Sequence, residues 1–222
     1  MFVGHYGVSF AAKRVDRTIP LWVLFLAVQF LDVLWAPFIL LGIEKIRIVP
    51  GITASNPFDL YYMPYTHSLV AAVFWSCLGG FAYHFIAHPT HRQTSAVVGV
   101  AVFSHWILDL IVHRPDLPLY GNSAKVGLGL WNAPVLAFGL EAALLFGGLW
   151  FCLRGRQAHS HGTLVFGVLM LAIQAYIFFG PPPTSDRAAA LTALIAYAVF
   201  ATVIWWLQDR HAKAGDIQNV MK

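Results

Sequence analysis

Asp109 lies four residues after His105 inside an otherwise apolar stretch, Val97 to Val112. Residues four apart share one face of a helix, so we expect the carboxylate and the imidazole to point at the same place. Ionisable side chains are costly at membrane depth and mark functional sites there. Three further ionisable residues interrupt or open other apolar stretches: Asp32, His67 and Glu141. Because imidazole and carboxylate are ligands for divalent transition metals, the sequence predicts a buried metal or proton site.

The composition indicates a membrane protein. Of the 222 residues, 59% are hydrophobic and 11% are charged, whereas soluble domains usually carry about 25% charged residues. A run of about 20 apolar residues spans a bilayer as a helix. Six such runs are predicted as membrane spans: Leu21–Ile43, Ser68–His88, Thr94–His113, Ala133–Leu153, Gly162–Gly180 and Ala188–Leu207. We therefore expect an all-α polytopic membrane helix bundle over residues 1–222, a single domain with its motifs in 1–120 and apolar helices in 121–210.

A short helix is expected before the first span, over Val3–Val15. Basic residues follow this segment instead of preceding it, so we do not expect a cleavable signal peptide. At about 1.5 Å per residue the helix reaches roughly 18 Å, enough to enter a bilayer part-way without crossing it. Its first turn carries His5.

If the chain crosses the membrane six times, its Lys and Arg residues are unevenly divided between the two sides of the membrane. Nine lie on the side of the first basic turn: Lys13, Arg14, Arg17, Arg92, Arg154, Arg156, Arg210, Lys213 and Lys222. Five lie on the other side: Lys45, Arg47, Arg114, Lys125 and Arg187. The positive-inside rule then predicts that both termini lie on the cytoplasmic side. The sequence contains no run of basic residues interleaved with aromatic residues, so nucleic-acid binding is not predicted.

This topology brings the candidate site residues to similar depths. Each lies between the middle of the membrane and its outer face: His5, Asp32, His67, His105, Asp109 and Glu141. A shared site requires its members at one depth, so the sequence predicts one pocket in the outer half of the membrane.

Four motifs follow one another along the first half of the chain: Gly4-His5, Asp32, Thr66-His67-Ser68 and Ser104-His105-Trp106-Ile107-Leu108-Asp109. In content and order they resemble the membrane-bound metal-dependent hydrolases of the bacterial inner membrane. The resemblance covers roughly residues 1–120, and the second half matches only as apolar helices. That family is in turn similar to the bacterial zinc-dependent phospholipase C enzymes, which have a comparable order of His and Asp ligands.

The resemblance implies five metal ligands: His5, Asp32, His67, His105 and Asp109. It also implies that Asp109 is able to bridge two metals. Many relatives carry a second acid beside the first, as Asp-x-Asp-His, and a His-Arg before Thr-His-Ser. Here Asp32 stands alone, and Tyr62-Met63-Pro64-Tyr65 replaces the His-Arg. Glu141 is the candidate for the missing carboxylate, and zinc is the divalent metal that nitrogen and oxygen ligands favour.

The expected function is a membrane-embedded metal-dependent hydrolase acting on a lipid or lipid-linked (phospho)ester. Zinc lowers the pKa of a bound water to about 7 and so supplies hydroxide at neutral pH. Asp32 or Glu141, whichever does not bind metal, is the candidate catalytic base. A site within the outer leaflet favours a lipid-like substrate that enters sideways from the bilayer. The alternatives are an ion- or proton-coupled transporter that uses the same buried cluster, and a regulatory protein with a non-catalytic metal.

Simpler interpretations remain for several residues. His105 and Asp109 alternatively form a hydrogen-bonded pair that locks helices together. A second group of imidazoles is predicted at the cytoplasmic end of the second span and in the next cytoplasmic loop: His84, His88, His91, His159 and His161. No carboxylate accompanies this group, which is more typical of interfacial histidines. His113 and Asp116 are expected to belong to an external loop or to support the ligands.

Labelling of a single introduced cysteine tests the predicted orientation. In a variant that lacks Cys77 and Cys152, Arg156→Cys should resist a membrane-impermeant maleimide added to intact cells, because Arg156 is predicted to be cytoplasmic. Lys125→Cys, predicted on the opposite side, is the positive control. Labelling of Arg156→Cys together with protection of Lys125→Cys would reverse the topology.

Overall fold

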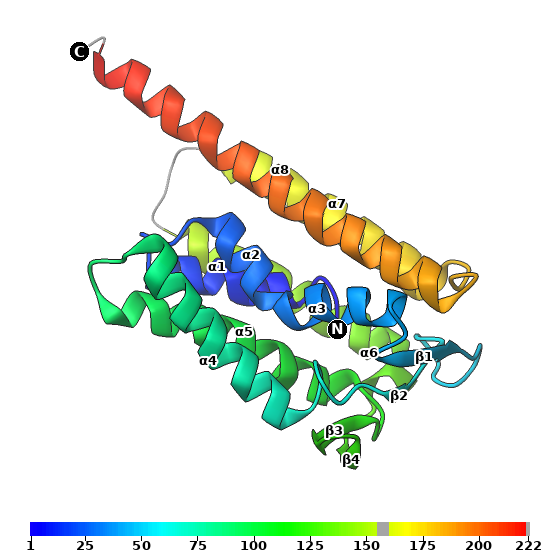
Figure 1. Cartoon of the computed structure of the whole chain (residues 1–222). Helices are drawn as coiled ribbons and strands as arrows, with labels where there is room; N and C mark the ends of the chain where they lie inside the picture. The colour runs from blue at the N-terminus through cyan, green and yellow to red at the C-terminus, as the bar shows by residue number, and fades with distance from the viewer. Residues whose placement is uncertain (155–159, 221–222) are drawn as a thin grey trace.

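The computed structural model describes residues 1–154 and 160–220, with side chains described up to Gln208. The predictions made for Arg156, His159 and Lys222 lie outside the described residues. Within the described residues, five helices are long and apolar enough to cross a membrane. They are α4 (Leu69–Ala87), α5 (Arg92–Val112), α6 (Pro134–Leu153), α7 (Ser160–Phe179) and α8 (Asp186–Val220), the last with its apolar part over Asp186–Gln208. They coincide with the second to sixth predicted spans, and the all-α architecture is confirmed (Figure 1).

The first predicted span, Leu21–Ile43, is not one straight helix. It is a pair, α2 (Leu21–Val28) and α3 (Phe30–Leu40), bent by 54° at Gln29. The side-chain amide of Gln29 donates to the Phe2 carbonyl at 3.0 Å, which fixes the bend against the N-terminal segment. Because α2 ends at Val28, the carbonyl of that residue has no partner within the helix and is available to another group. Counted as one broken span, the pair brings the number of spans to six.

The short N-terminal helix α1 (His5–Val15) lies in the middle of the bundle, packed on α2, α5 and α6. Tyr6 and Phe10 are fully buried in the main apolar core. Gly7 of α1 and Gly148 of α6 lie in backbone contact, and a Cβ added at either would overlap the opposite backbone. The close backbone contact of α6 at Gly148 is therefore with the short helix α1.

A second close approach joins α4 and α5. A Cβ added at Gly80 would lie 2.9 Å from the Ser95 carbonyl oxygen, and one at Gly99 would lie 2.9 Å from the Ser76 carbonyl oxygen. These two helices therefore cross with their backbones nearly touching, as small residues allow in membrane helices.

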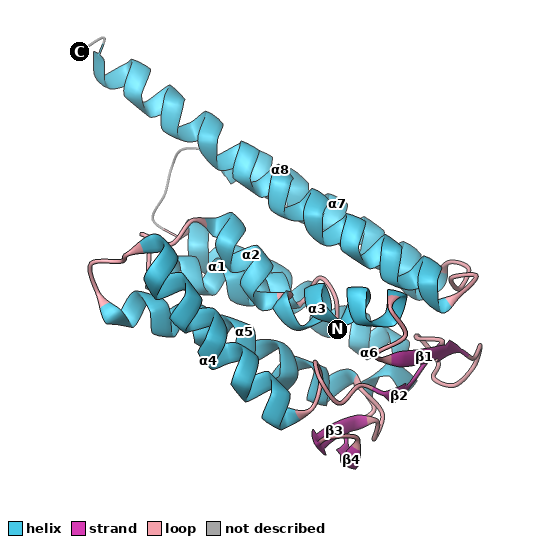
Figure 2. Cartoon of the chain, in the orientation of Figure 1, coloured by secondary structure: helices cyan, strands magenta, loops and turns pink. Residues whose placement is uncertain are grey.

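Two short antiparallel hairpins cover one end of the bundle, where loops were predicted (Figure 2). The first pairs β1 (Lys45–Ile48) with β2 (Phe58–Tyr62), and the second pairs β3 (Leu117–Tyr120) with β4 (Ser123–Val126). A 3-10 turn (Leu130–Asn132) then leads into α6. The hairpins follow α3 and α5 directly, so they lie next to the residues at the ends of these helices.

The outer surface of the long helices is apolar. Of the most apolar 18 residues of α4, only 17% are buried. Large side chains such as Phe74, Phe81 and Phe85 are exposed. On α7 and α8 the exposed residues include Val168 and Ile195. Such a surface suits contact with lipid chains, in agreement with a membrane protein.

Substitution of the glycines of α6 tests the central position of α1. Gly148→Ala should lower the free energy of unfolding by about 1–3 kcal/mol or more, because the added methyl group overlaps the Gly7 backbone. Gly147→Ala is the matched control, since no atom lies within 4 Å of its added Cβ, and alanine favours a helix. Thermal unfolding of the purified protein in detergent measures both. Equal melting temperatures for the two variants would contradict the close α1–α6 contact.

Candidate metal centre

Five of the predicted site residues converge in the interior of the bundle. Their ligand atoms form two groups, His5 with His105 and Asp109, and Asp32 with His67 and His105; within each group all atoms lie within 4.8 Å of one another. His105 belongs to both groups. These residues come from α1, α3, the start of α4 and α5, so the fold unites positions spread over more than 100 residues.

Asp109 is the common partner of the imidazoles. Its Oδ2 atom lies 3.1 Å from His105 Nε2, 3.7 Å from His67 Nε2 and 3.5 Å from His113 Nε2. Its Oδ1 atom lies 3.5 Å from His5 Nε2. The two oxygens of one carboxylate thus face different imidazoles, which is the arrangement expected of a bridging ligand.

Asp32 forms the more accessible side of the centre. Its Oδ1 atom lies 3.3 Å from His67 Nε2 and 3.7 Å from His105 Nε2, while Oδ2 accepts a hydrogen bond from the Tyr197 hydroxyl at 2.7 Å. The side chain of Asp32 is 16% exposed, against 3% for Asp109. Water or a substrate group reaches the centre most readily beside Asp32.

The tautomer of His105 follows from the bend in the first span. Its Nδ1 atom lies 2.8 Å from the Val28 carbonyl oxygen, which has no helical partner because α2 ends there. A carbonyl only accepts, so Nδ1 carries a proton, and in the neutral ring Nε2 presents its lone pair to Asp32 and Asp109.

The tautomer of His67 is set in the same way by two neighbouring residues. The Thr66 hydroxyl donates to Glu44 Oε2 at 2.6 Å, so its oxygen accepts from His67 Nδ1 at 2.7 Å. Nε2 of His67 is then free of its proton and faces the centre. Carboxylate and hydroxyl partners of this kind orient metal-binding imidazoles. Burial raises the pKa of the Glu44 carboxyl, and the His67 ring and the Thr66 hydroxyl oppose that shift.

His113 also faces the centre, although the sequence predicted for it only a place in the loop or a supporting role. Its Nδ1 atom contacts Asp116 Oδ1 at 2.9 Å, which leaves Nε2 directed at Asp109. Arg114 donates to Asp116 at 3.1 Å and also binds Asp59 of β2, so the first hairpin is tied to this imidazole. The repeated spacing of four residues from His105 to Asp109 to His113 is the signal in the sequence for this additional imidazole.

The nitrogen His105 Nε2 is buried, and within the described residues it forms no hydrogen bond despite its nearness to two carboxylates. Two atoms held at about 2.0–2.1 Å by one tetrahedral ion lie roughly 3.3 Å apart. The nitrogen-to-oxygen distances among Asp32, His67, His105 and Asp109 are 3.1 to 3.7 Å. The residues present therefore fit a divalent metal ion.

Glu141 has other partners than the imidazoles. Its Oε2 atom accepts from the backbone amides of Phe2 and Gly4, at 3.0 and 3.1 Å, and Oε1 accepts from the Gln174 side chain at 2.8 Å. These bonds hold the N-terminal segment, whose α-amino group at Met1 lies 2.5 Å from Asp109 Oδ1. The contacts give Glu141 a positioning role, and its predicted part as catalytic base or as the missing ligand stays a prediction.

The second predicted group of imidazoles lies at the other end of α4 and α5. His84 contacts Ser95 at 3.4 Å, and His88 and His91 are exposed beside the turn between the helices. Among the described residues they form no cluster with the geometry of a metal site.

No family model, curated protein or solved structure matches this chain. The residues themselves carry what can be inferred of its chemistry.

Metal analysis of the purified protein tests the candidate centre. The wild type should retain a divalent metal in stoichiometric amount, and Asp109→Ala or His105→Ala should lose most of it, because each removes an atom shared by several contacts. His84→Ala, a change of the same kind outside the centre, should retain the metal. Equal metal content in the wild type and Asp109→Ala would exclude the centre, and loss in His84→Ala alone would move the metal to the other end of the helices.

Proposed function

We propose that this chain is a membrane-embedded metal-dependent hydrolase of the bacterial inner membrane, acting on a lipid or lipid-linked phosphoester. The observation that carries the proposal is the buried, unpartnered Nε2 of His105 beside two carboxylates. Buried polar atoms without partners are rare, and a bound cation satisfies this one. The resemblance of the four motifs to membrane-bound hydrolases supports the same chemistry.

Zinc is the cation that we propose for the centre. Zinc is commonly bound by imidazole nitrogen and carboxylate oxygen, and when bound it activates water and stabilises negative charge on a phosphoryl or acyl oxygen. His67, His105 and Asp109 would hold it, with Asp32 beside them. His5 lies beside Oδ1 of Asp109, the oxygen that the Met1 α-amino group also contacts.

The protein residues supply orientation and proton transfer. Thr66 and Val28 fix the rings of His67 and His105, so no rearrangement of the imidazoles is needed on binding. Asp32 is the proposed base, since it is the most accessible carboxylate of the centre and its Oδ1 atom is free of the Tyr197 hydrogen bond. Tyr197 holds the carboxylate in place through Oδ2.

The surroundings favour a lipid-like substrate. The centre lies within helices whose outer faces are apolar, and the two hairpins cover the adjoining end of the bundle. A phosphoester attached to an acyl or isoprenoid chain would place its polar group beside Asp32 while its chain stays in the bilayer. We propose that the hairpin end faces outward and that the basic turn after α1 and the C-terminal end of α8 lie on the cytoplasmic side, as the distribution of Lys and Arg suggests. Met1 itself lies inside the bundle, beside Asp109.

Turnover of lipid phosphoesters in mixed micelles tests the function. Asp109→Asn should lower turnover by at least about a hundredfold, the upper end of effects for partners that only orient metal ligands, because an amide is a poorer ligand than a carboxylate. Asp186→Asn, the same change at the start of α8, should leave turnover intact. A chelator should abolish wild-type activity, and added zinc should restore it. Full activity of the chelated protein and of Asp109→Asn would contradict the hydrolase proposal. Ion flux in vesicles without hydrolysis would favour the alternative, an ion- or proton-coupled transporter.

A further inference from the structure

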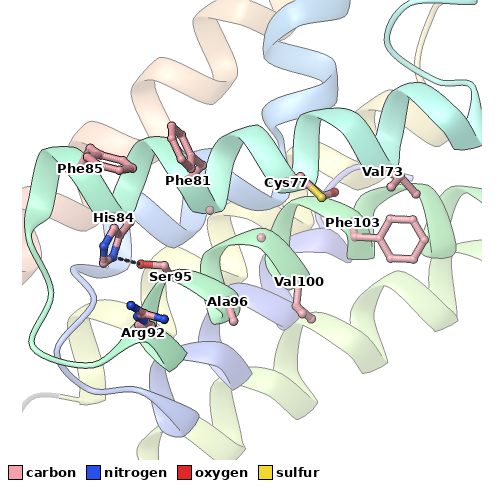
Figure 3. Close-up of a pocket in the computed structure, with 13 residues that line it drawn as sticks. Val73, Cys77, Phe81, His84, Phe85, Arg92, Ser95, Ala96, Val100 and Phe103 are labelled. Carbon is pink, nitrogen blue, oxygen red and sulfur yellow. Dashed lines mark hydrogen bonds between the residues drawn. The ribbon is translucent and has the colours of Figure 1, made fainter.

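A groove of about 820 Å³ lies between α4 and α5, away from the candidate metal centre (Figure 3). Its lining runs from His84 and Arg92 beside the α4–α5 turn to Val73 and Phe103 nearer the middle of the bundle. Asp109 lies farther along α5, toward the hairpins. The groove and the centre therefore belong to opposite ends of the same helix pair.

The close crossing of α4 and α5 shapes the groove. Gly80 and Gly99 bring the two backbones together and leave no side chain above the crossing. Large apolar residues stand on either side: Phe81 and Phe85 on α4 are 62% and 55% exposed, and Val100 on α5 is 68% exposed. A narrow floor between bulky flanks is a shape that accepts a flexible chain.

One end of the groove is basic. Arg92 and His84 lie together there, and His84 Nδ1 contacts the Ser95 hydroxyl at 3.4 Å. No carboxylate lines the groove. In the part of the chain that the structure describes, Arg92 has no ion pair. The positive charge of its guanidinium at the edge of an apolar groove has no counterpart within the described chain.

The length of the groove matches one leaflet. From Arg92 to Phe103 the helix advances eleven residues, or about 17 Å at 1.5 Å per residue. The hydrocarbon core of a bilayer is about 30 Å thick, so one leaflet takes up roughly 15 Å. A chain lying in the groove would span its leaflet with its headgroup beside Arg92.

We propose that this groove binds an anionic phospholipid, with the phosphate at Arg92, His84 and Ser95 and an acyl chain along Gly80 and Gly99. The charge at the groove end selects this occupant. A helix from a second copy of this chain that lay in the groove would cover Arg92, and the groove has no carboxylate to neutralise it. The lipid site lies in the leaflet opposite the metal centre, so it is separate from the proposed substrate.

Native mass spectrometry of the full chain tests the proposal. The protein is reconstituted in nanodiscs with equal amounts of phosphatidylglycerol and phosphatidylcholine of the same acyl chains, and bound lipids are counted after release. The wild type should retain phosphatidylglycerol in preference. Arg92→Gln should lower its retention about fivefold, the effect of one basic residue near an anionic surface, and Arg92→Lys should largely keep it.

Two further variants separate charge from shape. Ala96→Trp fills the groove from an exposed position on α5 and should reduce retention of both lipids. Arg17→Gln removes an exposed charge from the basic turn after α1 and should behave as the wild type. All variants should keep their helical circular dichroism and metal content, which separates failure here from failure of the metal centre. Wild-type retention in both Arg92→Gln and Ala96→Trp would overturn the proposal, as would a dimer that Ala96→Trp dissociates whatever lipid is present.

Discussion

Three imidazoles of the candidate centre each direct their Nε2 atom toward it, because their Nδ1 atom is hydrogen-bonded to an acceptor outside the centre. His105 donates to the Val28 carbonyl, His67 to the Thr66 hydroxyl and His113 to the Asp116 carboxylate. Their Nε2 atoms consequently present lone pairs toward Asp109, which is itself an acceptor. Acceptors gathered in an apolar interior repel one another unless positive charge lies among them. The Met1 α-amino group beside Asp109 Oδ1 supplies one such charge, and a bound metal ion would supply another. The surrounding elements maintain the external hydrogen bonds.

Each irregular element of the fold supports one of those bonds. The break at Gln29 frees the Val28 carbonyl, and Glu44, just beyond α3, holds Thr66. The hairpin residue Asp59 binds Arg114, which steadies Asp116. The backbone contact of Gly7 with α6 allows α1 to enter the bundle and present His5. Regular spans alone would leave the imidazole rings without a fixed orientation.

The sequence predicted those features that depend on local patterns. Apolar runs of span length located the long helices, and the spacing of His105 and Asp109 placed both on one face of α5. The bend at Gln29 was not predictable, because the residues on both sides are apolar and the Phe2 carbonyl that fixes it lies 27 residues away. The hairpins and the Glu44–Thr66 bond likewise depend on contacts distant in sequence. His113 carried a usable signal in its spacing from Asp109, but the helix ends one residue earlier, and the sequence alone favoured a loop.

X-ray absorption at the zinc edge tests most directly whether a metal lies among these side chains. For the purified, zinc-loaded protein the account predicts a first shell of nitrogen and oxygen at about 2.0–2.1 Å, with outer scattering from several imidazoles. Replacement of His67 by alanine should reduce the imidazole scattering. A first shell with sulfur at about 2.3 Å, pointing to Cys77 or Cys152, or a shell without imidazole, would contradict the account.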